Sequence, residues 1–173
     1  PTASHSPFKP YDGGKLLLTA GAPRIIGDDE ERMLLVLRAV VEGDRRLAVS
    51  IGVNRVIQQS CSLAHAETMA YMTAQQRLQQ YRLNAIGRKI TLATSSQPCC
   101  QCYGATIWAG IDTLLIGGRS EDVESLTGFD EGPLPADWVG ELNRRGIAVQ
   151  RDLCRDQARA ALARYRELEG QVY

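Results

Sequence analysis

The strongest constraint on how this chain can fold comes from one histidine and two cysteines that lie far apart in the sequence. The histidine opens the stretch His65-Ala66-Glu67, and the cysteines follow in Pro98-Cys99-Cys100-Gln101-Cys102. One imidazole and two thiolates can bind a zinc ion and leave its fourth coordination position open, whereas a structural zinc site normally has four protein ligands. The fold must therefore bring His65 next to Cys99 and Cys102.

Other interpretations of these residues compete with an open zinc site. His-Ala-Glu occurs by chance in many proteins, and Cys-x-x-Cys alone is also typical of a redox pair or of half a structural zinc site. A structural site would need a fourth ligand such as Cys61 or Cys100, whereas we interpret Cys61 and Cys154 as small buried hydrophobic residues. We favour the open site because all its parts occur in order. Both motifs also fall at predicted helix starts, where the helix dipole stabilises thiolates.

The composition argues against several classes of protein. Of 173 residues, 44% are hydrophobic and 23% are charged, which is typical of one soluble globular domain. Twenty basic residues balance twenty acidic ones, so a partner bound through its phosphates, such as a nucleic acid, is not expected. No apolar run approaches the roughly 20 residues that span a membrane. Five cysteines, three of them clustered, fit a metal site in the reducing cytoplasm better than a disulfide framework.

Predicted strands and helices alternate along the chain, which indicates a three-layer α/β/α domain with a mixed sheet. We assign residues 1–27 to an N-terminal arm and residues 28–173 to the domain, which includes a C-terminal helix and tail. Strands are predicted at residues 47–51, 89–94, 113–116 and 147–149. Helices are predicted at about residues 28–42, 65–81, 98–109, 136–145 and 155–169. Residues 117–135 are interpreted as a long polar connection.

The order H-x-E followed by P-C-x-x-C is the signature of the zinc deaminases. Glu67 lies two residues after His65, so the two side chains do not share a helix face. Zinc in an open site lowers the pKa of its water to roughly 7. We expect Glu67 to take a proton from that water and deliver it to a ring nitrogen and then to the departing amine.

From about Met33 to the C-terminus, the chain resembles the cytidine/deoxycytidylate deaminase superfamily. The resemblance rests on Asn54 before Ala64-His65-Ala66-Glu67, on the stretch from Pro98 to Cys102, and on Gly104-Ala105-Thr106-Ile107-Trp108-Ala109. It is closest to the branch that contains guanine deaminase and tRNA adenosine deaminase. It implies a cytidine-deaminase-like fold, a Zn²⁺ cofactor and a homodimer.

A second stretch, Gly128-Phe129-Asp130-Glu131, is similar to a segment of guanine deaminases whose last carboxylate reaches the purine. That resemblance implies that Glu131 helps to bind the substrate and to move protons. It also implies that Asn54 contacts a ring carbonyl or nitrogen and that the backbone N–H of Ala66 donates to the ligand. Without the resemblance, Glu131 would be interpreted as a solvated loop acid and Asn54 as a turn residue.

Aromatic residues complete the expected pocket. Trp108 and Phe129 are candidates for its lining, although core packing would explain buried aromatic residues equally well. Tyr173 ends a tail that resembles guanine-deaminase tails, which fold over an active site, often that of the partner subunit. Such a tail can exclude water from the pocket.

The chain departs from the family pattern at two places. Gln97 stands where the family usually has Glu, and Glu42-Gly43-Asp44 runs almost directly into Arg45-Arg46-Leu47, where the family usually has an apolar strand. Either that strand is absent or residues are missing from the sequence.

The function that we expect is hydrolytic deamination of a free amino-purine-like base, most simply of guanine to xanthine and ammonia. Three alternatives stay open: deamination of a triazine or purine analogue in specialised metabolism, deamination of adenosine in tRNA, and a non-enzymatic zinc-stabilised binding module.

Overall fold

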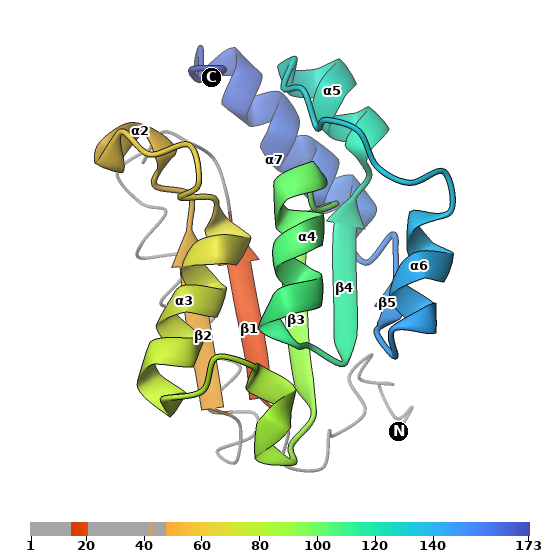
Figure 1. Cartoon of the computed structure of the whole chain (residues 1–173). Coiled ribbons are helices and arrows are strands. Elements are labelled where there is room, and N and C mark those ends of the chain that lie inside the picture. The colour runs from red at the N-terminus through yellow and green to blue at the C-terminus, as the bar shows by residue number, and fades with distance from the viewer. Residues whose placement is uncertain (1–14, 21–41, 43–47) are drawn as a thin grey trace, which may run out of the picture.

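The computed structural model of the chain describes residues 15–20, residue 42 and residues 48–173. Five strands form one sheet with the order β2-β1-β3-β4-β5 (Figure 1). Each strand pair in this sheet is parallel. The strands are β1 (Lys15–Ala20), β2 (Ala48–Val53), β3 (Ile90–Ser96), β4 (Thr113–Gly118) and β5 (Ala148–Gln150).

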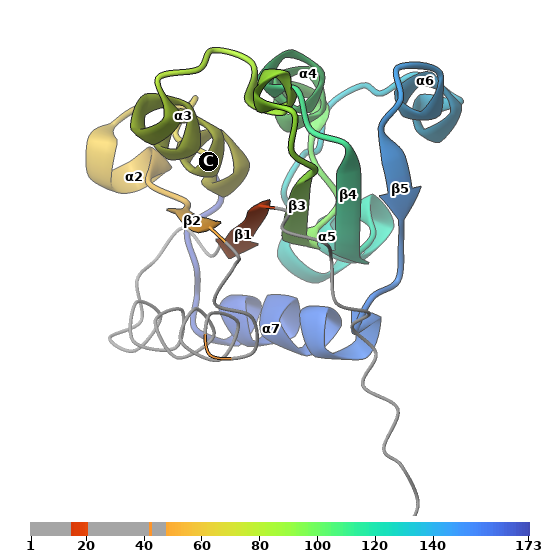
Figure 2. The same ribbon diagram turned by 90° about the horizontal axis from the view of Figure 1, so that it is seen from below.

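Helices cover both faces of the sheet. On one face lie α3, α4 and α6, and on the other lie α5 and α7 (Figure 2). The predicted three-layer α/β/α architecture is therefore confirmed. The helices are α2 (Val56–Gln59), α3 (Ala66–Leu78), the 3₁₀ helix η1 (Leu83–Ile86), α4 (Cys100–Ala109), α5 (Ser120–Thr127), α6 (Trp138–Arg144) and α7 (Arg155–Glu167). No helix within the described residues is both long and apolar enough to cross a membrane.

Three details differ from the sequence analysis. The sheet was expected to be mixed, whereas all four strand pairs of the described residues are parallel. Residues 15–20, which were assigned to the N-terminal arm, form β1 between β2 and β3. The predicted polar connection contains α5, whose eight residues bury Asp122, Val123 and Thr127. The predicted helix at residues 28–42 falls almost wholly outside the described residues.

Both missed elements have a physical explanation. The sequence of β1 is a short apolar run, which is typical of a buried strand in a parallel sheet. A run of this length is equally consistent with other kinds of buried segment, so the sequence alone does not identify it as a strand. Helix α5 is rich in polar residues, and its first turn is capped by a side chain. Asp122 accepts a hydrogen bond of 2.9 Å from the backbone N–H of Arg119, which makes a helix start that hydrophobic periodicity does not reveal.

The main core lies between the sheet and the helix layer of α3, α4 and α6. It joins Leu92 of β3 and Leu114 and Ile116 of β4 to residues of α3 and α6, and these side chains are almost completely buried. Helix α3 approaches β2 closely, because a Cβ atom at Gly52 would overlap the carbonyl oxygen of Ala66 and the backbone of Ala70. The glycine therefore lets the start of α3 pack directly against the end of β2.

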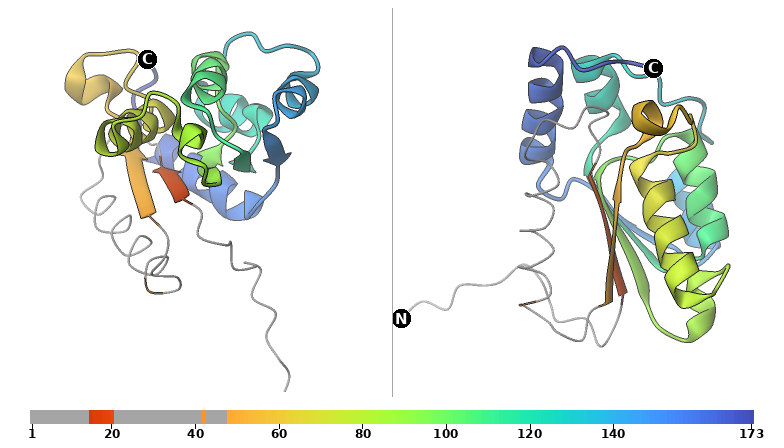
Figure 3. Two further views of the ribbon diagram at one scale, coloured as in Figure 1. Left: turned by 60° about the horizontal axis from the view of Figure 1, so that its bottom comes forward. Right: turned by 90° about the vertical axis from the view of Figure 1, so that its left-hand side faces the viewer.

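Parallel strands place their carboxyl ends at one edge of the sheet, where active sites of α/β domains commonly form. Helix α3 follows β2 at this edge, and α4 follows β3. From the end of α7 on the opposite face, the chain runs over the same edge to the C-terminus (Figure 3). Segments from three parts of the sequence thus meet above the strand ends.

Candidate active site

The three predicted metal ligands, His65, Cys99 and Cys102, come together at the starts of two helices; we call them the metal group. His65 is the N-cap residue of α3, and Cys99 is the N-cap residue of α4. Both caps have extended backbone conformations, which turn the chain into the helix at that point. Cys102 lies in the first turn of α4 and is completely buried. Nδ1 of His65 lies 3.5 Å from Sγ of Cys99 and 3.6 Å from Sγ of Cys102.

These distances fit tetrahedral zinc. With Zn–S bonds of about 2.3 Å and a Zn–N bond of about 2.0–2.1 Å, the nitrogen and each sulfur lie about 3.6 Å apart. All three ligand atoms lie within 4.8 Å of one another, and within the described part of the chain this group contains three ligands and no fourth. Cys61 and Cys100, the candidates for a fourth ligand, do not belong to it. The donor set therefore suits a zinc ion with one open position.

The metal group carries one thiolate at neutral pH. A hydrogen bond from the Cys102 thiol lowers the pKa of Cys99 to about 4. The same contact, together with burial, raises the pKa of Cys102. The hydrogen bond with Cys99 raises the pKa of His65. Because zinc binds thiolate and neutral imidazole, binding releases protons from this group, and the affinity for zinc increases with pH.

The carboxylate of Glu67 lies beside the metal group on the first turn of α3. It is 9% exposed, and burial raises its pKa. Its Oε2 lies 3.3 Å from Sγ of Cys102, and its Oε1 accepts a hydrogen bond of 3.1 Å from Oγ1 of Thr94. A raised pKa brings a carboxyl group closer to the range in which it both accepts and returns protons near neutrality. The position of Glu67 suits the predicted proton shuttle.

Thr94 is a site residue that the sequence analysis did not single out. It lies near the end of β3, is buried, and its hydroxyl also lies 2.9 Å from the carbonyl oxygen of Ser96. A hydroxyl has one proton to donate, so Glu67 and Ser96 share this donor. Its sequence signal is weak, because threonine is common in strands for packing reasons alone.

We expect Thr94→Val to lower kcat about tenfold, because a hydrogen bond to a charged group is worth roughly one order of magnitude or more. The change removes the hydroxyl that orients Glu67 and keeps the shape of the side chain. Zinc content and melting temperature should stay close to those of the wild type. Thr94→Ser, which restores the hydroxyl, is the control. Equal kcat values for the two variants would show that Thr94 does not orient Glu67.

Tyr173 contacts Asn54, Phe129 and the metal ligand His65, and Glu131 lies close enough to His65 to raise its pKa; we call Asn54, Phe129, Glu131 and Tyr173 the ring site. The backbone N–H of Val56 donates to Oδ1 of Asn54 at 3.1 Å, which fixes the amide so that Nδ2 faces Tyr173. Nδ2 then donates to the Tyr173 hydroxyl at 2.6 Å. The Tyr173 ring meets the rings of His65 and Phe129 edge to face, with centroids 6.1 and 5.1 Å apart.

The loop that carries Glu131 is attached to the start of α4. The backbone N–H of Cys100 donates to the Glu131 carbonyl oxygen at 2.9 Å. Oδ1 of Asp130 accepts from the backbone N–H of Gly132 at 2.8 Å, which closes the turn. Burial, and then the negative charge of Cys99, raise the pKa of Glu131 to about 8. A raised pKa brings this carboxyl group towards the range in which it can donate a hydrogen bond as well as accept one.

Gln97, where the family resemblance led us to expect an acidic residue, is buried and makes two hydrogen bonds to neighbouring segments. Its backbone N–H donates to the carbonyl oxygen of Gly118 at 2.8 Å, and its Nε2 donates to Oγ of Ser120 at 3.2 Å. These bonds join the segment before Cys99 to the start of α5. A neutral amide thus fixes the position of the first cysteine ligand.

Not every candidate residue reaches the site. The backbone N–H of Ala66 belongs to the first turn of α3, where such groups lack partners within the helix. Trp108 lies on α4, but its side chain is 77% exposed, so the structure does not place it in the ring site. Cys154 is exposed and Cys61 is partly exposed, so the prediction that both are buried is wrong.

Comparison with known proteins supports the same chemistry. A family model described as the cytidine and deoxycytidylate deaminase zinc-binding region matches residues 36–118, which include the metal group and Glu67. A curated relative, the tRNA-specific adenosine deaminase of Buchnera aphidicola subsp. Schizaphis graminum, is 27% identical over 117 residues, which are 68% of this chain and 71% of the relative.

Solved structures with higher identity cover more of the chain. The guanine deaminase from Nitrosomonas europaea is 40% identical, with a TM-score of 0.68, and the match covers 84% of this chain and 88% of that one. The protein NE0047 in complex with 2,6-diaminopurine is 38% identical, with the same TM-score, and the match covers 83% and 82% of the two chains.

Proposed function

Because the chain belongs to the cytidine and deoxycytidylate deaminase superfamily, we propose that it is a zinc-dependent hydrolase of a free amino-purine-like base, and that it converts guanine to xanthine and ammonia. The observation that carries the proposal is the ring site beside the metal group, where Tyr173 packs edge to face on His65 and Phe129 and accepts a hydrogen bond from Asn54, with Glu131 close enough to act on His65. The likeness to a guanine deaminase over 84% of the chain supports the choice of base.

Each group of the site has a distinct role in this proposal. Zinc, when bound by the metal group, supplies the Lewis acid that makes a water nucleophilic near neutral pH. Glu67 carries the two protons of the attacking water in turn, the first to a ring nitrogen and the second to the amine, which leaves as ammonia while a carbonyl forms. Nδ2 of Asn54 gives one N–H to the Tyr173 hydroxyl and has a second N–H that can donate to an acceptor of the ring. The backbone N–H of Ala66 is a further donor.

Glu131 contributes a second acid to the ring site. Since its pKa is raised to about 8, its carboxyl group can donate to a ring nitrogen when protonated and accept from a ring N–H when ionised. Phe129 and Tyr173 add apolar surface that favours a planar ring and excludes water.

A free base fits this arrangement better than a nucleotide within tRNA. Enzymes that act on a base in nucleic acid need a basic surface for the backbone and an open path for the flipped base. Here twenty basic residues balance twenty acidic ones, and the Tyr173 side chain lies between Asn54 and His65 in the ring site. Because one curated relative is a tRNA-specific adenosine deaminase, the substrate test below includes tRNA.

Turnover of a panel of substrates tests the proposal. Ammonia release should be measured with guanine, ammeline, adenine, cytosine and a tRNA that carries a target adenosine. We expect guanine to give the highest kcat/KM and tRNA to give none. A chain that turns over ammeline and not guanine would be a deaminase of another heterocycle. Salt-sensitive binding and deamination of tRNA would replace the proposal altogether.

We further propose a homodimer in the cytoplasm. Exposed apolar side chains on α3 and α4, including Met72 and Trp108, offer a surface for a second copy. Free cysteines at the metal group favour a reducing compartment. Sedimentation should give twice the monomer mass, and fractionation should recover the protein with soluble cytoplasmic enzymes. A monomer or an extracellular protein would contradict these two points.

A further inference from the structure

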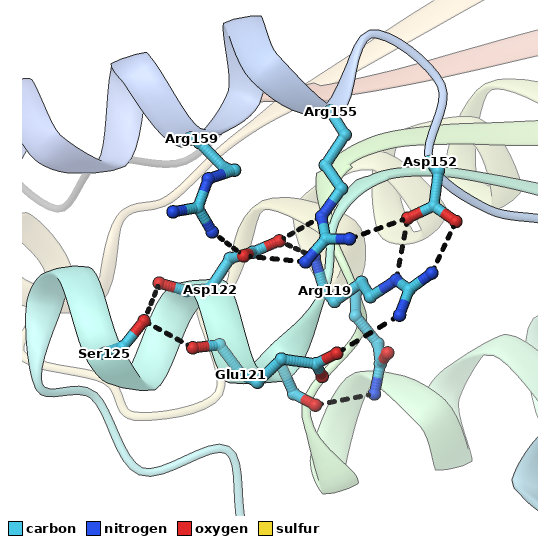
Figure 4. Close-up of polar contacts among 9 residues, drawn as sticks. Arg119, Glu121, Asp122, Ser125, Asp152, Arg155 and Arg159 are labelled. Atoms are coloured by element: carbon cyan, nitrogen blue, oxygen red, sulfur yellow. Dashed lines mark hydrogen bonds and ion pairs between the residues drawn. The ribbon is translucent and has the colours of Figure 1, made fainter.

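Asp122, in the first turn of α5, is a buried carboxylate surrounded by arginine residues (Figure 4). Its side chain is 2% exposed. Arg155, at the start of α7, donates to both carboxylate oxygens at 2.7 and 2.9 Å, and Arg159, one turn later, donates to Oδ1. The backbone N–H of Arg119 completes the set of donors. The hydrogen bonds from Arg155 hold the pKa of Asp122 well below its usual range.

A second ion pair fixes the same two helices at a neighbouring point. Arg119, the N-cap residue of α5, donates from Nε and Nη2 to the two carboxylate oxygens of Asp152, at 2.7 and 2.8 Å. Asp152 lies in the segment that leads into α7. The starts of both helices are therefore held together by two bidentate pairs, a geometry that fixes orientation as well as distance.

The other ends of these helices lead to the ring site. Helix α5 ends at Thr127, two residues before Phe129, and α7 is followed by the tail that ends at Tyr173. The Phe129 ring stacks on Tyr165 of α7, with centroids 5.9 Å apart, and contacts the Tyr173 ring. The tail itself packs on Tyr165: the Tyr165 hydroxyl donates to the Gln171 carbonyl oxygen, and a Cβ at Gly170 would overlap the Tyr165 ring.

Because α7 is long, a small change in its orientation at the ion pairs would move the residues at its other end, which contact the ring site. A helix of thirteen residues is about 20 Å long. A tilt of about 5° at its start therefore moves its far end by nearly 2 Å. Misplacement of a binding group by about 1 Å can cost a large part of an enzyme's efficiency. Apolar packing alone would tolerate such a tilt better than paired charges do, because it is less directional.

We propose that Asp122, Arg155 and Arg159 form a positioning cluster that sets α7 against α5 and so holds Phe129 and Tyr173 over the bound base. This inference rests on the proposed function of the ring site. The cluster does not touch the substrate, and it acts through the two aromatic side chains. Its loss should weaken substrate binding and leave the steps performed by Glu67 and the metal group intact.

Arg159→Gln tests the cluster with a small perturbation, since this side chain is 42% exposed and Arg155 still neutralises Asp122. We expect KM for guanine to increase about five- to tenfold, with kcat within about twofold of the wild type and with unchanged zinc content. Arg164→Gln is the matched control, because Arg164 lies on the same helix and makes an exposed ion pair with Glu167. Equal KM values for the two variants would overturn the proposal.

Hydrogen exchange gives a readout that needs no substrate. Amides of residues 128–131 and 168–173 should exchange faster in Arg159→Gln than in Arg164→Gln, while those of α3 and α4 should not change. If the wild type does not act on guanine, the proposed function fails, but this comparison still decides the positioning role. Equal exchange in all three proteins would overturn it.

A double-mutant cycle with Tyr173→Ala separates positioning from general destabilisation. If the cluster acts through the tail, Arg159→Gln should raise KM by less than about twofold once Tyr173 is removed, because the two changes affect one unit. A KM increase by the same factor in both backgrounds would show that the cluster does not act through Tyr173. Asp122→Asn extends the series, provided that its melting curve is still cooperative.

Discussion

Replacing Glu67 by Gln should lower kcat by about a thousandfold, the middle of the range that general acid–base catalysis contributes. The amide keeps the size of the side chain and can still accept the hydrogen bond from Thr94, but it cannot take and return a proton. Because Glu67 is not one of the three metal ligands, zinc content should stay at the wild-type level.

Glu167→Gln is the matched control for this variant. Glu167 is an exposed residue at the end of α7, and the same chemical change there should leave kcat within about twofold, as for most surface substitutions. Steady-state kinetics with guanine and metal analysis of both variants provide the measurement. Undiminished turnover in Glu67→Gln would show that Glu67 is not the proton shuttle, whereas a wild type that turns over no substrate would favour the remaining alternative, a non-enzymatic zinc-stabilised binding module.

Cys102→Ser should abolish both zinc binding and turnover, with a loss of activity of about a thousandfold or more. Cys102 is completely buried and contributes one of the two sulfurs of the metal group. A serine hydroxyl is a poor ligand at neutral pH, because its oxygen stays protonated where a metal-bound thiol does not. Treatment of the wild type with a chelator should have the same effect, and added Zn²⁺ should restore activity to the wild type only.

Cys100→Ser tests whether the zinc site has a fourth protein ligand, because it changes a cysteine outside the metal group. Cys100 lies between the two ligands in sequence, but it is exposed and does not belong to the metal group. The variant should retain about one zinc ion per chain and near-normal turnover, as an open three-ligand site requires. Loss of zinc from Cys100→Ser would indicate a fourth protein ligand and a structural site.

Residues of the site that lie in short sequence motifs could be predicted from the sequence, whereas residues brought together only by the tertiary fold could not. His65, Cys99 and Cys102 form two short motifs whose chemistry is specific, so the sequence predicted their meeting without a knowledge of the fold. Asn54, Phe129, Glu131 and Tyr173 were expected through resemblance alone. Their gathering beside His65 depends on where α5 and α7 lie, which no local pattern states.

The missed features depend on tertiary structure in the same way. Strand β1 is a short apolar run whose role appears only when it lies between β2 and β3. Helix α5 buries an aspartate, which is unfavourable unless arginine residues from α7 approach it, and those residues lie 33 and 37 positions further along the chain. Thr94 resembles any threonine of a strand until Glu67 is seen beside it.

Trp108 shows the opposite error. The family resemblance made Trp108 a candidate for the pocket lining, and core packing was an equal explanation for a buried aromatic residue at this position. Its helix, α4, instead turns it outward, with 77% of the side chain exposed. Helix periodicity alone does not say which face meets the sheet when apolar residues occur on several faces, as they do in this helix.

X-ray absorption at the zinc edge tests the central claim, an open metal site of one imidazole and two thiolates, most directly. The purified wild-type protein should show two sulfur ligands at about 2.3 Å and two nitrogen or oxygen ligands at about 2.0–2.1 Å, one of which belongs to a water molecule. A shell of three or four sulfur atoms, or a protein that does not retain zinc, would contradict the account.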